Sequence, residues 1–315
     1  MVARLLPAHV LCLTVLLAGV VPPVAAGSVE LLLSGSERLY TRVSEGLQAQ
    51  LDADVAPQTI TLRRATLDQP PSRSAADLTV AVGMAACERA LAAASRAPLL
   101  CTLVPKAGFE GITDGRRRAD VSAIYLDQPV ARQLSLARLL APDATRAGLL
   151  VGPTFREQRA AAMRLGRTVV LTLDSEGADD ERAATRAIQR LVARNDLILP
   201  VYDPAALTPS SAKWLLHLAY QKQRPVVGFS RAYVDAGAVA AVFTEPEQIG
   251  RQTGQTVARF FQDQRRRLSA PQYPTAFKVA VNRPVASALG LAPPSDAALA
   301  RAMGQRGATS GEPSP

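Results

Sequence analysis

Residues 225–291 read PVVGFSRAYVDAGAVAAVFTEPEQIGRQTGQTVARFFQDQRRRLSAPQYPTAFKVAVNRPVASALGL. Short apolar runs in this stretch have the length and composition of buried strands, and longer runs with apolar residues at three- and four-residue spacing are typical of helices. The pattern predicts strands over 225–230, 238–243 and 277–282, and helices over 250–261 and 285–291. This order of elements predicts that the chain ends in an α/β segment.

The chain before this segment also alternates strands with helices. Apolar runs that end at small or polar residues indicate the strands, and amphipathic stretches between them indicate the helices. Such alternation predicts parallel sheets that are covered by helices on both faces. The expected strands cover residues 29–33, 60–62, 77–83, 98–104, 122–126, 147–151, 168–173 and 197–201.

Two successive α/β units of this kind predict a protein of two lobes. We expect lobe 1 to cover residues 27–126, with 244–276 returning to it, and lobe 2 to cover 127–243, with 277–291 returning to it. The chain would then cross between the lobes three times. Residues 292–315 are rich in Ala, Pro, Gly and Ser, and we expect them to form a C-terminal tail whose end is disordered.

Composition identifies a globular protein, with 48% hydrophobic and 20% charged residues among 315. The net charge of +9 comes almost entirely from arginine. A nucleic-acid-binding protein would need this charge gathered on one face together with aromatic residues that stack on bases. Aromatic residues make up only 4% of the chain. We therefore expect no nucleic-acid partner.

The N-terminus has the pattern of a cleaved signal peptide. Arg4 precedes an apolar core from Leu11 to Val21, and Val24-Ala25-Ala26 forms a small-residue cleavage site. Cleavage after Ala26 would leave a mature chain that begins at Gly27. The sequence thus predicts a signal peptide over residues 1–26 and export to a bacterial periplasm.

Export affects the interpretation of the two cysteines of the mature chain, Cys87 and Cys101. An oxidising compartment favours disulfides, and the rise of a helix and of a strand places the two residues at similar heights when the elements pack antiparallel. A disulfide is therefore one interpretation, and a pair of small buried apolar residues is the other. His217 is the one histidine of the mature chain, so a multi-histidine metal site is excluded.

Several stretches resemble the substrate-binding proteins of ABC transporters, of the type that includes receptors for aromatic amino acids. The resemblance rests on residues 77–91, 97–101, 121–125 and 139–150, and on the whole of 225–291. It implies the type I periplasmic binding protein fold, an α/β fold of two lobes with three hinge crossings. The loop 152–155 is shorter than in that family, and Ser34-Gly35-Ser36 replaces an aromatic-rich turn. The identity of the ligand therefore cannot be transferred.

In open α/β sheets ligands bind beyond the carboxyl ends of the strands, so the two lobes would face each other across one cleft. Asp203 could bind an ammonium group or cap the next helix, and Arg231 could pair with an anion or lie on the surface. The serines could equally cap helices. The candidate ligand-binding residues are Ser34, Ser36, Gly83, Met84, Thr154, Asp203, Ser230 and Arg231.

A second group of residues falls where the chain is expected to cross between the lobes. The candidate hinge residues are Tyr125, Asp127, Thr244, Glu245 and Val279. The sequence contains no nucleophile–base motif, phosphate-binding loop or dinucleotide fingerprint. We therefore predict no catalytic residues, no metal site and no cofactor, and expect a protein that is not an enzyme.

The resemblance and the expected cleft favour a monomeric periplasmic receptor of an ABC uptake system. It would close by hinge motion on a small polar or anionic ligand and deliver that ligand to an inner-membrane permease complex. The alternative is a periplasmic sensory or interaction protein of the same fold that works without a permease.

Overall fold

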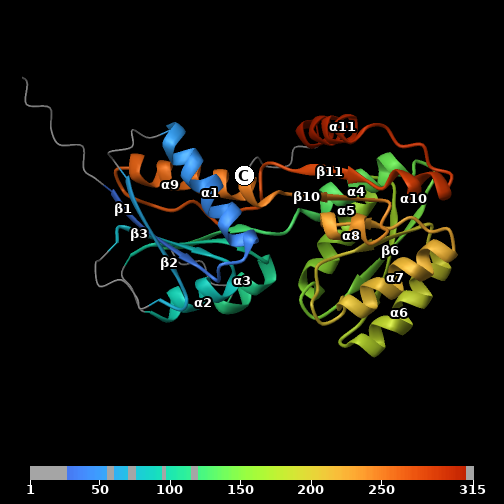
Figure 1. Cartoon of the computed structure of the whole chain (residues 1–315). Helices are drawn as coiled ribbons and strands as arrows, with labels where there is room; N and C mark the ends of the chain where they lie inside the picture. The colour runs from blue at the N-terminus through green and yellow to red at the C-terminus, as the bar shows by residue number, and fades with distance from the viewer. Residues whose placement is uncertain (1–26, 55–59, 70–75, 94–96, 115–119, 310–315) are drawn as a thin grey trace, which may run out of the picture.

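The computed structural model describes residues 27–54, 60–69, 76–93, 97–114 and 120–309. The predicted signal peptide, residues 1–26, lies outside the described residues. Two α/β bodies lie side by side, joined by extended segments (Figure 1). No helix within the described ranges is long and apolar enough to span a membrane.

Lobe 1 is built on a five-stranded parallel sheet in the order β2-β1-β3-β4-β5. Its central strands are apolar on both faces, as expected for a parallel sheet between helices. Helices α1 and α9 cover one face and α2 and α3 the other. The elements are β1 (Gly27–Leu33), α1 (Arg38–Asp54), β2 (Ile60–Thr66), β3 (Leu78–Val82), α2 (Met84–Ala92), β4 (Leu99–Val104), α3 (Lys106–Ile112), β5 (Val121–Tyr125) and α9 (Pro246–Gln262).

Helix α9 follows lobe 2 in the chain but packs against α1 in lobe 1. Glycines at the contact allow the two helices to approach closely. A Cβ atom on Gly250 would overlap the carbonyl of Val43, and one on Gly46 would overlap the backbone of Glu247. The glycines of the sequence GRQTG therefore fix α9 to the first lobe.

Lobe 2 contains two three-stranded sheets, β7-β6-β8 and β11-β10-β9. A parallel bridge between Ile198 and Val226 joins them, and only β11 is antiparallel to its neighbour. The strands are β6 (Arg146–Val151), β7 (Thr172–Gly177), β8 (Leu197–Pro200), β9 (Val227–Gly228), β10 (Ala240–Phe243) and β11 (Lys278–Val281).

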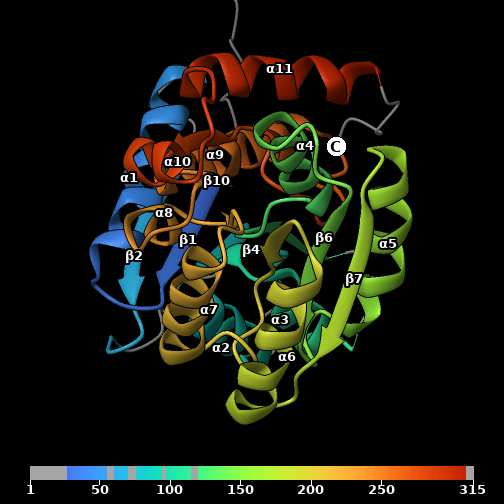
Figure 2. The same ribbon diagram turned by 90° about the vertical axis from the view of Figure 1, so that its right-hand side faces the viewer.

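Helices cover both faces of this second sheet (Figure 2). Helix α4 packs on one face, whereas α6 and α7 pack on the other through a separate apolar cluster. The helices are α4 (Val130–Leu140), the 3-10 turn η1 (Arg156–Gln158), α5 (Arg159–Thr168), α6 (Glu181–Arg194), α7 (Pro209–Gln221), α8 (Arg231–Asp235), α10 (Arg283–Ala288) and α11 (Asp296–Thr309).

The strand predicted over residues 168–173 begins four residues later, at Thr172. Residues 159–168 form α5, and the two valines that suggested a strand lie in the turn after it. Val170 has a φ of 59° and is 72% exposed. The apolar pair therefore belongs to a helix end, where β-branched residues give a misleading signal.

The tail expected over residues 292–315 instead contains α11. Leu299 and Met303, four residues apart, are buried and pack in the core of lobe 2. The helix lies against α4 and β11 (Figure 1). Alanine-rich composition suggested disorder, but alanine is also the best helix former, and two apolar anchors are enough to dock the helix.

Candidate functional site: a cavity between the lobes

A cavity of about 440 Å³ lies where the chain passes between the lobes. The first two crossing segments contribute to its wall, as does Tyr273 shortly before the third, together with α1 and α3 from lobe 1 and the loops after β6, β8 and β9 from lobe 2. Its position at the carboxyl ends of the strands is the one expected for ligand binding in open α/β sheets.

Much of the cavity wall is aromatic or aliphatic. Tyr202 and Phe229 meet edge to face, with ring centroids 6.2 Å apart. Tyr202 is 37% exposed, and burial together with the charge of Asp127 raises the pKa of its phenol. The apolar and aromatic lining residues are Leu39, Leu103, Leu126, Val130, Phe155, Val201, Tyr202, Phe229, Phe243 and Tyr273.

Arg42 of α1 lines the cavity and is held in a charged cluster at the start of α9. It hydrogen-bonds both carboxylate oxygens of Glu247, one at 2.7 Å, and lies 3.1 Å from Glu245. The bond to Glu247 raises the pKa of the Arg42 guanidinium. Lys278, at the start of β11, lies 3.5 Å from the other Glu245 oxygen. The cluster links lobe 1 to the third crossing.

The first crossing places Asp127 in the cavity wall. The backbone N–H of Lys106 donates to its carboxylate at 2.5 Å. Burial raises the pKa of Asp127, and the bond from Lys106 opposes that shift only in part. This carboxyl group therefore binds its proton more tightly than an ordinary aspartate.

The three crossing segments are tied to one another by side chains. Gln128 donates to Thr244 at 2.5 Å, and the Thr244 hydroxyl donates to the carbonyl of Ala276 at 2.7 Å. Arg132 of α4 donates to the carbonyl of Pro274 at 2.7 Å. A single polar network therefore connects the three segments that any movement of the lobes would bend.

Of the residues proposed from the sequence as ligand-binding, Thr154, Ser230 and Arg231 line the cavity. The Arg231 guanidinium donates to Asp235 at 2.9 Å, which raises the pKa of Arg231. Both side chains of that pair are largely exposed. Of the proposed hinge residues, the cavity wall includes Asp127, Thr244 and Glu245.

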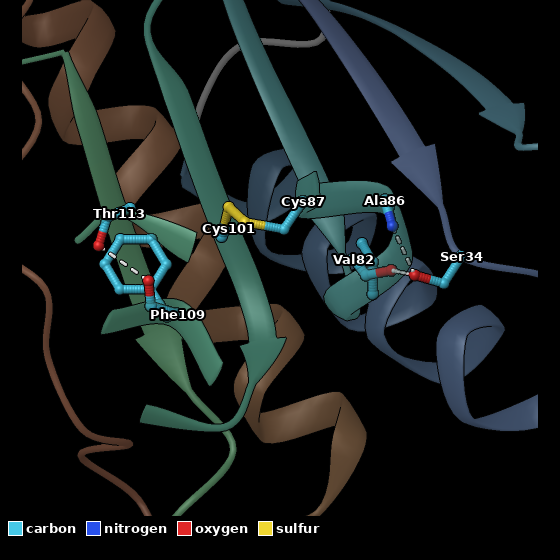
Figure 3. Close-up of a disulfide and its surroundings, with 7 residues drawn as sticks. All are labelled: Ser34, Val82, Ala86, Cys87, Cys101, Phe109 and Thr113. Carbon is cyan, nitrogen blue, oxygen red and sulfur yellow. Dashed lines mark hydrogen bonds between the residues drawn. A yellow bond between two sulfur atoms is a disulfide. The ribbon is translucent and has the colours of Figure 1, made fainter. Parts of the chain in front are cut away.

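The remaining candidates lie outside the cavity wall. Ser34 donates to the carbonyl of Val82 at 2.8 Å and accepts the N–H of Ala86 at 3.0 Å (Figure 3). It thereby occupies the N-terminal turn of α2 that we expected to face a ligand. Gly83 begins this turn with a φ of 88°, and Met84 is half-buried and packs against the core of lobe 1. Ser36 is exposed.

Asp203 is buried, with 1% exposure, and accepts hydrogen bonds from the N–H groups of Phe155 and Ala205 at 3.1 and 3.2 Å. A Cβ atom on Gly152 would overlap its carboxylate. Asp203 therefore holds the loops after β6 and β8 together, in contact with backbone rather than with the cavity.

Two proposed hinge residues lie inside the packed lobes. Tyr125 packs edge to face against Phe109 and Tyr273, and its N–H donates to the carbonyl of Gln272 at 2.9 Å. Val279 pairs with Val242 inside the sheet of lobe 2. Both residues flank the crossings from within the cores.

Cys87 of α2 and Cys101 of β4 form a disulfide, with Cα atoms 5.5 Å apart (Figure 3). Both residues are fully buried in lobe 1. The disulfide fixes α2 to the sheet, and neither cysteine lines the cavity between the lobes.

The model of the family "ABC transporter substrate binding protein" matches residues 72–303. The match covers most of the chain, from just before β3 of lobe 1 through lobe 2, and includes most residues of the cavity wall. This chain belongs to that family. The family is one of binding proteins rather than of enzymes.

Solved structures that resemble this substrate-binding protein have the same two-lobed fold. An ABC domain from Streptococcus pneumoniae in complex with L-Trp is 15% identical, with a TM-score of 0.60 and coverage of 88% of this chain and 98% of that one. A ligand-free, open substrate-binding protein with adhesive properties from Clostridium difficile is 17% identical, with a TM-score of 0.69 and coverage of 86% and 97%. No curated protein sequence matches significantly. The predicted fold class is confirmed.

Several residues of the cavity wall of this substrate-binding protein were not among the candidates taken from the sequence. Phe229 directly follows β9, so the position of strand ends could have identified it. Leu39 and Arg42 lie three residues apart on α1, which presents one face to the cavity. Tyr273 comes from an irregular connection for which the sequence gives no signal.

Proposed function

We propose that this chain is the extracytoplasmic receptor of an ABC uptake system and closes by hinge motion on a small ligand. The observation that carries the proposal is the cavity between the lobes, whose wall includes the first two crossing segments and Tyr273, which lies shortly before the third. Its volume of about 440 Å³ suits a small molecule. Because the hinges form part of the wall, contacts with a ligand would favour one arrangement of the lobes over the other.

Within this proposal, Thr154, Ser230 and Arg231 approach the ligand from lobe 2. The polar groups at the crossings, Thr244 and Glu245, would couple its binding to bending of the hinges. An aromatic wall with a few polar groups is typical of small-molecule sites, in which apolar surface supplies affinity and polar groups fix orientation.

Membership in the substrate-binding family supports a permease complex as the partner. The proposed pathway is export by the N-terminal signal peptide, ligand capture as a monomer in the periplasm, and delivery to the inner membrane. The arginine-rich surface has no role in this proposal beyond solubility.

The test combines binding with shape. The mature protein is screened by thermal shift against amino acids, amines, small carboxylates, phosphorylated compounds and sugars, since a ligand at 100 times its dissociation constant stabilises by about 2.7 kcal/mol. Small-angle X-ray scattering then measures the radius of gyration, which a ligand that closes the lobes decreases.

Two matched variants place the ligand in the cavity. Ala107→Trp fills the lobe 1 wall and should abolish the thermal shift, whereas Ala212→Trp on α7, away from the cavity, should preserve it. If no compound in the panel shifts the melting temperature and none decreases the radius of gyration, the receptor function is contradicted. An interaction protein of the same fold is then favoured.

A further inference from the structure

Charged side chains around the cavity are paired, and the largest cluster is neutral. Arg42 and Lys278 carry two positive charges, and Glu245 and Glu247 carry two negative ones. All are within ion-pair distance of a partner of opposite charge. Because the cluster is already satisfied, a ligand carboxylate that approached Arg42 would have to compete with Glu247, which holds it by two bonds.

Two further ion pairs next to the cavity are also neutral. Arg231 pairs with Asp235 one helical turn away at 2.9 Å. The Lys106 ammonium, whose own backbone N–H binds Asp127, pairs with Glu110. Neither pair adds net charge to the cavity.

Asp127 is the exception. It lines the cavity and forms no ion pair within the part of the chain that the structure describes. It interacts with the Lys106 N–H, with the charges of Lys106 and Glu110, and with the phenols of Tyr202 and Tyr273, whose pKa values its charge raises. Lys106 and Glu110 neutralise each other, and their charges shift the pKa of Asp127 in opposite directions. Ionised Asp127 therefore leaves a net negative charge in a cavity with a mainly apolar wall.

Gln133 supplies a second acceptor in the same wall. Its side chain is 4% exposed, and its Nε2 donates to the carbonyls of Pro200 at 2.7 Å and Val227 at 2.6 Å. These bonds fix the orientation of the amide, since the reverse orientation would place Oε1 against two carbonyl oxygens. Both donors are used, and no described residue donates to Oε1, so Gln133 can offer a ligand only an acceptor.

The rings of the cavity suit the same kind of ligand. Tyr202, Phe229, Phe243 and Tyr273 all contribute to its wall. Aromatic faces attract a cation and also accommodate an apolar body, whereas they offer nothing to a carboxylate.

We propose that the ligand is a monocation, an organic amine with an apolar body, whose ammonium group neutralises Asp127, and that the cavity disfavours a ligand carboxylate. This inference rests on the proposed receptor function and specifies its ligand class. Of the polar or anionic ligand expected from the sequence, it keeps the polar alternative, because the arginines on which an anion would depend already have carboxylate partners.

The test uses three probes that share one phenylalkyl skeleton and differ only in charged groups: phenethylamine, phenylalanine and 3-phenylpropanoate. Isothermal titration calorimetry on the mature protein measures their affinities near neutral pH. We expect phenethylamine to bind at least tenfold more tightly than phenylalanine, and 3-phenylpropanoate to bind most weakly. The ranking is obtained on the unmodified protein and so does not depend on any variant folding.

Two isosteric variants then assign the effect to one carboxylate. Asp127→Asn should weaken the binding of phenethylamine at least tenfold. The affinity for 3-phenylpropanoate should stay unchanged or increase. Asp179→Asn, which removes an exposed carboxylate paired with Arg156, should change neither. A folded Asp127→Asn protein with undiminished phenethylamine affinity would overturn the assignment to Asp127.

Other outcomes separate the two proposals. Tighter binding of phenylalanine or 3-phenylpropanoate than of phenethylamine overturns the cation proposal and leaves the receptor function intact. Absence of binding by all three probes also overturns the cation proposal, while the receptor function is decided independently by the wider ligand panel and by contraction of the lobes.

Discussion

Gln128 Nε2 lies 2.5 Å from Thr244 Oγ1, a contact that joins the first and second crossings between the lobes. The same threonine hydroxyl donates to the carbonyl of Ala276 in the third crossing. One hydroxyl group thus connects three chain segments, the first 116 residues before Thr244 and the third 32 residues after it. Movement of the lobes must preserve these two bonds or exchange them.

Thr244→Val should loosen the hinge. The change removes one donor and one acceptor and lowers the free energy of unfolding by about 1–2 kcal/mol. Hydrogen–deuterium exchange should increase at the crossing segments. Thr41→Val is the control, because the Thr41 hydroxyl bonds only the carbonyl of Glu37 on the exposed face of α1. Equal exchange at the crossings in both variants would contradict the hinge role.

Stability should depend on pH through Asp127. Its pKa is raised by burial, so the folded protein holds this proton more tightly than the unfolded chain. The resulting stabilisation is complete below the unfolded pKa, about 4, and is lost as the pH rises through the folded value. The unfolding free energy of Asp127→Asn minus that of the unmodified protein should therefore grow with pH, as measured by urea titration.

The groups around Asp127 do not obscure this comparison. Lys106 and Glu110 are present in both proteins, and the phenols of Tyr202 and Tyr273 have pKa values raised above their ordinary range. A difference that stays constant from about pH 4 to pH 8 would show that Asp127 titrates normally.

The disulfide should stabilise lobe 1 without affecting the cavity. Cys87 and Cys101 are 14 residues apart in sequence, and a loop of this size contributes about 3 kcal/mol. Replacement of both by alanine should lower the urea midpoint by a corresponding amount. Ligand affinity should not change, because neither residue lines the cavity. A loss of affinity in a folded double variant would instead connect α2 to the site.

Helix α11 should contribute to the stability of lobe 2. Leu299 is 1% exposed in the lobe 2 core, so Leu299→Ala should cost about 2–5 kcal/mol. Arg301→Ala, on the exposed side of the same helix, should stay within about 0.5 kcal/mol. Thermal unfolding measures both. If Leu299→Ala changes the stability as little as Arg301→Ala does, the helix is only loosely attached to lobe 2.

Gly250→Ala tests the approach of α9 to α1. An added methyl group would overlap the carbonyl of Val43, and overpacking of this kind costs about 1–3 kcal/mol. Gly111→Ala is the matched control in α3, where nothing lies within 4 Å of the new atom. It should be neutral or stabilising by up to about 1 kcal/mol. Chemical denaturation of the two variants, measured side by side, gives the comparison.

The alternation of strands and helices was readable because period and length differ clearly between the two kinds of element. Local sequence patterns gave the wrong secondary structure where tertiary contacts determine the conformation of the segment. Val169 and Val170 resemble a strand but end a helix, and alanine-rich residues 296–309 dock through two side chains. The expectation that ligands bind beyond the carboxyl ends of the strands identified Thr154, Ser230 and Arg231, which line the cavity.

The same expectation could not show that the side chains of other residues at strand ends already bond to backbone groups of the protein. Ser34 and Asp203 are at turns of the expected kind, yet their side chains bond backbone groups. Whether a polar side chain faces a cavity or a neighbouring amide depends on its rotamer and packing, which one sequence does not encode in any local pattern. The pairing of Arg42 with Glu247, 205 positions away, is equally invisible.

The close packing of α9 on α1 affects the order in which the two lobes can fold. Residues 27–125 supply every strand of the first sheet, but one face of it remains incompletely covered until residues 246–262 arrive. Strands β6 to β10 of lobe 2 all precede α9 in the chain, and only β11 and the last two helices follow it. During vectorial synthesis, an apolar face of the half made first therefore stays open to other contacts while most of the second half is made.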